Sequence, residues 1–330
     1  MEATNTTSGT TPNVTSRAAS GGAPVSMQKV SRSFGTVRAL NGLSLDIAPG
    51  ELVALLGPSG CGKTTALRIL AGFETADSGT VSVDGKDIAP VPAAKRDMGM
   101  VFQSYSLFPN MSALDNVGFG LRMRKMGAAG RRRRAHELLE LVGLSALDAK
   151  VRLQLREQIR SLQQRLGITT LFVTHDQEEA LSMADRVGVM KDGSLEQIAV
   201  PAELYTRPAT AFVAEFVGTM NRIPGELSRG GQATALGTVT DVQAGCADLP
   251  PGPVDVLVRP ENLRIAAIAN GNGIVTSRTF LGSVSRIHVL LSGDVTVQVD
   301  VPSATAGQLL PGASVQVSLD GSPVQVAGRA

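Results

Sequence analysis

A glycine-rich stretch, GPSGCGKTT at Gly57–Thr65, carries residues whose types and spacing suit phosphate binding. Glycines let successive backbone N–H groups converge on phosphate oxygens, and the dipole of a following helix favours the negative charge. The lysine would reach the outer phosphates of a nucleotide, and the threonine after it would coordinate Mg²⁺ through its hydroxyl. The pattern predicts a nucleoside triphosphate site whose loop residues are Gly57, Pro58, Ser59, Gly60, Cys61, Gly62, Lys63, Thr64 and Thr65.

The loop needs a strand and a helix to hold it, and the neighbouring sequence predicts both. The apolar run LVALLG at 52–57 indicates a buried strand, and ALRILAG indicates a helix that ends at its glycine. Apolar residues at helical spacing between 155 and 166 predict another helix, and ITTLFVT at 168–174 predicts a strand. Asp176 and Glu179 form a D-x-x-E capping pair that opens the next helix. This alternation predicts an α/β fold with a parallel sheet.

The texture of the sequence divides the chain into three parts. Residues 1–24 consist almost entirely of small and polar residues, so we expect a disordered tail. Residues 25–217 carry the α/β pattern. Residues 218–330 carry short alternating strands separated by glycine and proline, which predict a small all-β domain with a barrel-like architecture.

Composition excludes some classes of protein. The formal net charge of +2 argues against a general affinity for nucleic acid. Cys61 and Cys246 have neither metal-ligand nor disulfide-framework spacing, which favours a reducing, cytosolic setting. No apolar run approaches the roughly 20 residues that a membrane span needs. The basic run Arg131–Arg134 is interpreted as a solvated helix start, with a contact to anionic lipid as the alternative.

Further motifs, taken in order with the phosphate loop, carry a resemblance to a known family. The chain resembles the ATP-binding subunits of ATP-binding cassette (ABC) importers, in the subgroup with a C-terminal TOBE-like β-barrel that serves polyamine, ferric-ion, sulfate, sugar or phosphonate uptake. Phe34 lies where that family places an aromatic residue that stacks on adenine. Gln103 matches the Q-loop glutamine, which meets Mg²⁺ or the attacking water. His175 matches the H-loop histidine, which contacts the γ-phosphate.

Two more segments extend the resemblance over residues 25–326. SALDAK at Ser145–Lys150 is similar to the D-loop of the dimer interface, and VRPENLRI at Val258–Ile265 is similar to a recurring segment of the barrel domain. The resemblance implies a phosphate-loop NTPase fold of the ABC type followed by the barrel. It also implies ATP and Mg²⁺ as ligands, with Thr64 and Gln103 as metal-contacting residues and His175 as a catalytic residue.

The resemblance implies partners as well. Transmembrane permease subunits and a second ATP-binding subunit, in a homodimer or a heterodimer, are expected as direct partners. An extracytoplasmic solute-binding protein is expected as an indirect one, and nucleic acid is not expected. The implied location is the cytoplasmic face of the bacterial inner membrane, as a peripheral subunit.

One part of the family pattern is missing. In this family a signature motif and a Walker B strand lie between the Q-loop and the D-loop; the strand ends in an Asp that helps hold Mg²⁺ and a Glu that activates water. Only 42 positions separate Gln103 from Ser145, and the Q-loop segment and a helix through Gly143 fill them. We therefore expect an internal deletion between Leu144 and Ser145. The signature-like LSRGGQ at 227–232 is predicted to be a glycine turn instead.

The expected deletion has two consequences. Loss of a general base typically costs about 10²–10⁴ in rate, so we expect poor ATP hydrolysis. Loss of four or five buried side chains from a central strand would remove about 6–15 kcal/mol, which approaches the whole stability of a domain, unless flanking strands close the gap. A non-catalytic nucleotide-binding regulatory or assembly protein is the alternative function, and a different phosphate-loop enzyme such as a kinase is a third.

Overall fold

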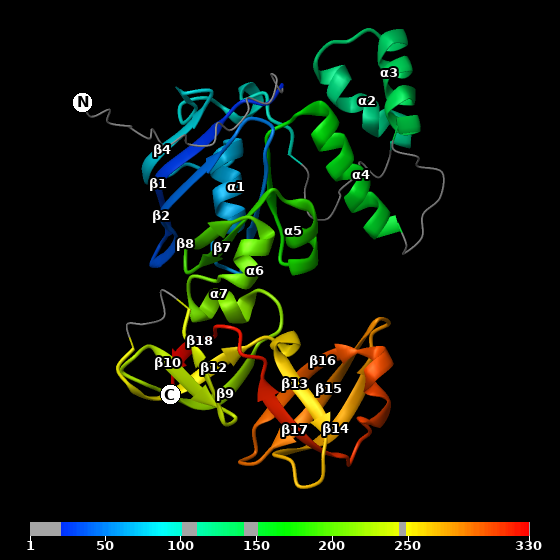
Figure 1. Ribbon diagram of the computed structural model, residues 1–330. Helices are drawn as coiled ribbons and strands as arrows, with labels where there is room; N and C mark the ends of the chain where they lie inside the picture. The colour runs from blue at the N-terminus through cyan, green and yellow to red at the C-terminus, as the bar shows by residue number, and fades with distance from the viewer. Residues whose placement is uncertain (1–20, 101–110, 142–150, 244–248, 330) are drawn as a thin grey trace, which may run out of the picture.

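The computed structural model describes residues 21–100, 111–141, 151–243 and 249–329 (Figure 1). Four features named from the sequence lie outside these ranges: Gln103, Cys246, the junction between Leu144 and Ser145, and the D-loop-like segment Ser145–Lys150. The same holds for residues 1–20 of the predicted tail.

The phosphate-loop strand β3 (Leu52–Leu56) lies inside a four-stranded sheet of order β6-β3-β7-β8. β6 (Thr170–Val173) and β7 (Arg186–Lys191) pair with β3 in parallel on its two sides, and β8 (Ser194–Ala199) runs antiparallel to β7. The predicted parallel α/β sheet is confirmed. The phosphate-loop strand β3 is one of its two inner strands, and among the described strands no gap separates β3 from its neighbours. The deletion itself and its cost in stability stay predictions, since residues 142–150 lie outside the described ranges.

Both faces of β3 are covered, which explains why all five of its residues are buried. Successive side chains of a strand point to opposite faces. Accordingly, Val53 and Leu55 belong to one hydrophobic cluster with residues of helix α1 (Lys63–Ala71). The alternate positions of β3 belong to a second cluster with residues of α5 (Gln177–Met183), α6 (Pro201–Thr206) and α7 (Ala211–Phe216).

A second sheet, which the sequence analysis did not separate from the first, is antiparallel. Its order is β2-β1-β4-β5, formed by β1 (Val25–Phe34), β2 (Val37–Ile47), β4 (Ser78–Val83) and β5 (Lys86–Asp87). The connection between β1 and β2 is too short for a crossover, so the two strands form a hairpin. The buried side chains of this sheet pack on the α1 side of β3.

Three further described α-helices lie between β5 and β6 in the chain. α2 (Ala113–Met123) and α3 (Ala128–Leu141) form a hairpin set to one side of the sheets (Figure 1). Arg132, Arg133 and Arg134 are exposed in α3, in agreement with the interpretation of a solvated helix. α4 (Val151–Leu166) precedes β6 and ends before Gly167, as predicted. Short 3₁₀ helices lie at Ala93–Lys95, Pro260–Asn262 and Ser303–Gln308.

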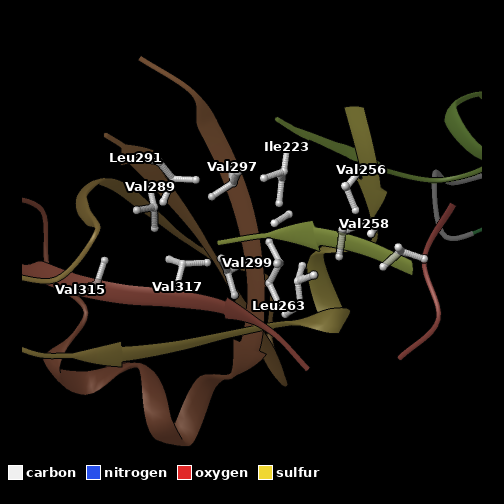
Figure 2. Close-up of a cluster of buried hydrophobic side chains, with 14 of the residues drawn as sticks. Ile223, Val256, Val258, Leu263, Val289, Leu291, Val297, Val299, Val315 and Val317 are labelled. Atoms are coloured by element: carbon white, nitrogen blue, oxygen red, sulfur yellow. The ribbon is translucent and has the colours of Figure 1, made fainter. Parts of the chain in front are cut away.

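The C-terminal part is all β, as predicted. Two five-stranded sheets, of order β11-β10-β9-β12-β18 and β13-β17-β14-β15-β16, share a single hydrophobic core. Figure 2 shows that core, to which both sheets contribute valine, leucine and isoleucine side chains. LSRGGQ forms the turn between β9 and β10, so the prediction of a glycine turn there is confirmed. The strands are β9 (Asn221–Leu227), β10 (Gln232–Ala235), β11 (Thr238–Asp241), β12 (Gly252–Val258), β13 (Leu263–Ala267), β14 (Gly273–Phe280), β15 (Val284–Leu291), β16 (Thr296–Pro302), β17 (Ser314–Leu319) and β18 (Gln325–Gly328).

The last residues of the predicted tail make hydrogen bonds with the folded part of the chain. The carbonyl oxygen of Ala23 accepts a hydrogen bond of 2.6 Å from the Thr169 hydroxyl, and that of Pro24 accepts one of 3.0 Å from Asp84 N–H. Ala23 and Pro24 are therefore held against the sheets, so the prediction that they belong to a disordered tail is wrong. None of the helices in the described ranges is long and apolar enough to span a membrane.

Candidate functional site

The glycine-rich loop connects the end of β3 to the start of α1 through a backbone that requires glycine. Gly62, the residue before the helix, has φ of 104°, a conformation that side-chain-bearing residues rarely adopt. A Cβ there would also lie 2.3 Å from the carbonyl oxygen of Ala39 in β2. The loop is thus packed tightly against the antiparallel sheet, and the glycine fixes both its path and its distance from β2.

The lysine of the motif is folded back on the loop. Its ammonium group donates hydrogen bonds to the carbonyl oxygens of Gly57, at 2.7 Å, and Pro58, at 2.9 Å, and lies 3.5 Å from the Cys61 sulfur. Lys63 and Cys61 are both buried. The positive charge is therefore held beside the backbone of the loop that is predicted to bind phosphate.

The N-terminus of α1 fits an anion. No side chain caps this end of the helix, and the first turn contains no acidic residue. Its first N–H groups therefore have no side-chain acceptor, and a phosphate oxygen is a suitable partner for them. Pro58, Ser59, Gly60 and Thr64 are exposed and Thr65 is half-buried, so the loop is open to solvent on this side.

The far end of α1 is held by an arginine that the sequence analysis did not single out. Arg96 donates hydrogen bonds of 2.7 Å to the carbonyl oxygens of Ile69, Leu70 and Val91. The last carbonyls of a helix lack partners within the helix, and a cation stabilises them. Burial lowers the pKa of the Arg96 guanidinium. This contact fixes α1, and with it the phosphate loop, to the segment that leads towards Gln103.

Phe34 ends β1 with its side chain 46% exposed, so it is not a core residue. The guanidinium of Arg32 lies 4.8 Å from the centroid of the Phe34 ring. Arg32 is itself held by Asp77, at 2.5 Å, and by Glu74, at 2.8 Å. Hydrogen bonds from the Arg32 side chain and from Ser33 N–H lower the pKa of Asp77. An exposed, positioned aromatic ring of this kind suits stacking on a base.

His175 follows β6 at the same edge of the sheet as the phosphate loop. Parallel strands end at the same edge, and Thr174 N–H donates to the Leu55 carbonyl oxygen in β3 at 3.2 Å. His175 is exposed. Its neighbour Asp176 caps α5 by accepting from Glu179 N–H at 3.1 Å, which confirms the predicted capping pair.

The structure thus brings the phosphate loop and His175 to one edge and places Phe34 on the adjoining antiparallel sheet. Gln103 lies outside the described residues. No group of three or more His, Cys, Asp or Glu side chains that could hold a metal ion occurs among the described residues. A magnesium ion at Thr64 would therefore draw its other ligands from phosphate oxygens, water and groups outside the described ranges. Arg32 and Arg96 belong to no motif, so the sequence did not predict their roles. The one available signal was the spacing of two residues between Arg32 and Phe34, which places both on one face of a strand.

The fold and the loop define a phosphate-loop nucleotide-binding protein with an appended β-domain. Residues 40–180 match the ABC transporter family, and residues 256–326 match the TOBE domain family. The chain is 42% identical to a sulfate/thiosulfate import ATP-binding protein of Chromobacterium violaceum, over 89% of this chain and 93% of that protein. It is 38% identical to an Fe(3+) ions import ATP-binding protein of Rhizobium etli, over 90% and 95%. It is 39% identical to a spermidine/putrescine import ATP-binding protein of Vibrio parahaemolyticus, over 83% and 86%.

The chain belongs to the ATP-binding subunits of ABC import systems. The resemblance drawn from the motifs, the ABC-type phosphate-loop fold and the TOBE domain are confirmed. The roles of individual residues stay predictions.

Proposed function

We propose that this chain binds ATP together with Mg²⁺ at the Gly57–Thr65 loop and couples the nucleotide to solute uptake through membrane permease partners. The observation that carries the proposal is the loop itself: a buried strand, a backbone shaped by glycine, an uncapped helix start and a lysine held beside it. Each of these features has a use in holding a triphosphate, and the family supplies the context.

The chain's own residues would act in four ways. Lys63 would exchange its contacts with the Gly57 and Pro58 carbonyls for the outer phosphates. Thr64 would supply a hydroxyl to Mg²⁺, with Gln103 as the second metal-contacting residue. Phe34 would stack on adenine and His175 would contact the γ-phosphate. Magnesium, when bound, neutralises charge on the phosphates.

We further propose that an internal segment is missing between Leu144 and Ser145. The alignment with the sulfate/thiosulfate relative has 346 positions, and since 89% of 330 residues is about 294, about 52 positions have no residue from this chain. The same reasoning gives about 41 positions for the Fe(3+) relative. In addition, Ile159 and Leu166 in α4 and Ile168 just after it are 36–50% exposed, which leaves apolar surface that a restored segment could cover. β6 ends the order of the sheet, so a lost strand would have joined beyond it.

Poor hydrolysis follows from this proposal. The Walker B Asp and Glu would be lost with the segment, and the described residues contain no group of three or more His, Cys, Asp or Glu side chains that could hold the metal in their place. A site that still cradles phosphates but lacks the general base would bind ATP and turn it over slowly. An intact partner subunit would not restore hydrolysis. The site on this chain's phosphate loop would still lack the general base, and the site on the partner's loop would lack the signature motif that this chain should supply.

The remaining parts of the proposal concern assembly. The expected partners are permease subunits and a second ATP-binding subunit, with a solute-binding protein contacted only through the permease, at the cytoplasmic face of the inner membrane. The relatives are named for sulfate, Fe(3+) and polyamine import, and we propose that the permease and the receptor, not this chain, select the solute. We assign residues 25–217 to the nucleotide domain and 218–330 to the regulatory domain.

The test compares two purified proteins: this chain and a version with the signature and Walker B segment of the sulfate/thiosulfate relative inserted between Leu144 and Ser145. Both should bind ATP in a fluorescence titration with Mg²⁺, and the restored version should release phosphate at least ~10² faster, as expected for recovery of a general base. Equal release rates would refute the impaired-hydrolysis proposal, and absence of ATP binding by this chain would refute the site.

The alternative, a non-catalytic regulatory or assembly protein, draws on the intact barrel core. It predicts ATP-dependent association with permease without phosphate release, whereas turnover in vesicles with permease favours the transport role.

A further inference from the structure

A single amide side chain connects the H-loop to the segment between the nucleotide-binding part and the barrel. Gln177 is the first residue of α5, two positions after His175. Its Nε2 donates to the Phe216 carbonyl oxygen at 2.5 Å, and its Oε1 accepts from Gly218 N–H at 2.8 Å. The two hydrogen bonds therefore bind the residues before and after Val217, which lies between α7 and β9.

An arginine of the barrel binds the same segment. Arg259, which follows β12 and is only 6% exposed, donates to the carbonyl oxygens of Val217 and Thr219. Its guanidinium also lies 4.0 Å from the ring centroid of Tyr205 in α6, and the Tyr205 hydroxyl donates to Glu261 at 2.6 Å. The segment at 216–219 is therefore bonded to the H-loop end of α5 and to the barrel at once.

Further contacts support both attachments. Around the H-loop, the Thr174 hydroxyl donates to the Glu179 carboxylate at 2.8 Å and accepts from Asp176 N–H at 2.9 Å. His175 and Gln177 therefore belong to one braced turn, and we expect them to shift together. At the other end, a Cβ on Gly218 would lie 2.8 Å from the Tyr205 ring and 3.0 Å from the Arg259 guanidinium, so the chain is closely packed against both side chains at this residue.

We propose that Gln177 is a positioning residue that transmits nucleotide occupancy at His175 to the barrel through residues 216–219. The proposal rests on the proposed function, because it requires nucleotide to meet the H-loop. Nucleotide that draws His175 towards the outer phosphates shifts the braced turn, and the two Gln177 bonds carry that shift into the segment that Arg259 holds. By linkage, the position of the barrel then biases nucleotide affinity in return.

The test is hydrogen exchange of the full chain with and without ATP and Mg²⁺, at nucleotide concentrations that saturate the response of the phosphate loop. In the unaltered chain, ATP should change the exchange rate of residues 216–219 by fivefold or more, on the order of typical couplings between sites. In Gln177→Ala the phosphate loop should still respond and the 216–219 response should vanish.

Gln197→Ala is the matched control. The Gln197 side chain also bridges backbone groups between α6 and α7: it donates to the Arg207 carbonyl oxygen at 3.1 Å and accepts from Ala209 N–H at 2.7 Å. It lies on β8, which does not carry the H-loop. This variant should keep the 216–219 response. Gln177→Glu keeps an acceptor for Gly218 N–H but opposes the Phe216 carbonyl, so its response should shrink.

The outcomes separate the two proposals. Protection of the phosphate loop without any change at 216–219 in the unaltered chain overturns the Gln177 route and leaves the nucleotide site standing. An undiminished 216–219 response in Gln177→Ala or Gln177→Glu also overturns the route. Absence of a nucleotide response at both places overturns the proposed function and the route together.

Discussion

The ammonium group of Lys63 donates a hydrogen bond of 2.7 Å to the carbonyl oxygen of Gly57, six residues earlier in the same loop. The Lys63 ammonium group is therefore held next to the backbone that would bind phosphate. Because this bond is internal, a ligand has to compete for the lysine, and only a strong acceptor such as a phosphate oxygen can do so at little cost.

Replacement of Lys63 should weaken nucleotide binding directly. A hydrogen bond to a charged group contributes about 1.5–3 kcal/mol, so Lys63→Met should reduce ATP affinity roughly 10- to 100-fold in a fluorescence titration. Lys86→Met, on the exposed strand β5, removes the same charge from the protein and should leave affinity unchanged. A loss of less than about threefold in Lys63→Met would contradict the role of this lysine.

The adenine role of Phe34 can be separated from phosphate binding. Stacking on an aromatic side chain contributes about 1–3 kcal/mol, so Phe34→Ala should weaken ATP binding roughly tenfold and leave binding of inorganic triphosphate unaltered. Phe73→Ala is the control, since Phe73 is also exposed, at 62%. If both ligands weaken equally in Phe34→Ala, the ring supports the fold and does not contact the base.

Two glycines of the loop should respond differently to alanine. Gly60 and Gly62 both have positive φ, so each substitution costs about 1–2 kcal/mol in backbone strain. A Cβ on Gly60 meets nothing within 4 Å, whereas on Gly62 it meets the Ala39 carbonyl oxygen. Gly62→Ala should therefore lower the free energy of unfolding clearly more than Gly60→Ala in denaturant titrations. Equal losses would show that the loop can move away from β2.

Replacement of Arg96, which binds the end of α1, should lower the free energy of unfolding more than replacement of the exposed Arg124. Arg96→Ala leaves the carbonyls of Ile69 and Leu70 without their cation, which should lower the free energy of unfolding by at least about 2 kcal/mol. Arg124→Ala removes an ion pair with Asp97 in which both side chains are more than 70% exposed, and should change it by less than about 0.5 kcal/mol. Similar effects of the two variants would deny Arg96 a structural role.

The pH dependence of stability should contain a contribution from Tyr205. Burial, together with the hydrogen bond to Glu261, raises the pKa of Tyr205 to about 12 from 10.0. A raised pKa means that the folded state keeps its proton longer, so this contribution is complete below pH 10 and is lost as pH rises from 10 towards 12. Tyr205→Phe should show a shallower fall in stability over that range than the unaltered chain. Parallel curves in urea titrations would contradict the assignment.

Local backbone chemistry explains which elements could be predicted. Gly72 ends α1 in the left-handed conformation, and Asp176 caps α5, because each of these roles depends on residues only a few positions apart. The hairpin turn at 228–231 was predictable for the same reason. The antiparallel sheet was not, because the pairing of β1 with β4 joins residues about 50 positions apart that no local pattern connects.

The sequence by itself determined the phosphate loop, its flanking strand and helix, and the family, since these depend on residue types at fixed short spacings. Only the tertiary structure decided that β3 is an inner strand of its sheet, that Arg96 binds the last carbonyls of α1, that Arg32 supports Phe34, and that Gln177 binds the segment before the barrel. Each of these contacts joins groups whose separation is set by how whole elements pack, and packing is fixed by the summed burial of many side chains and not by any one motif.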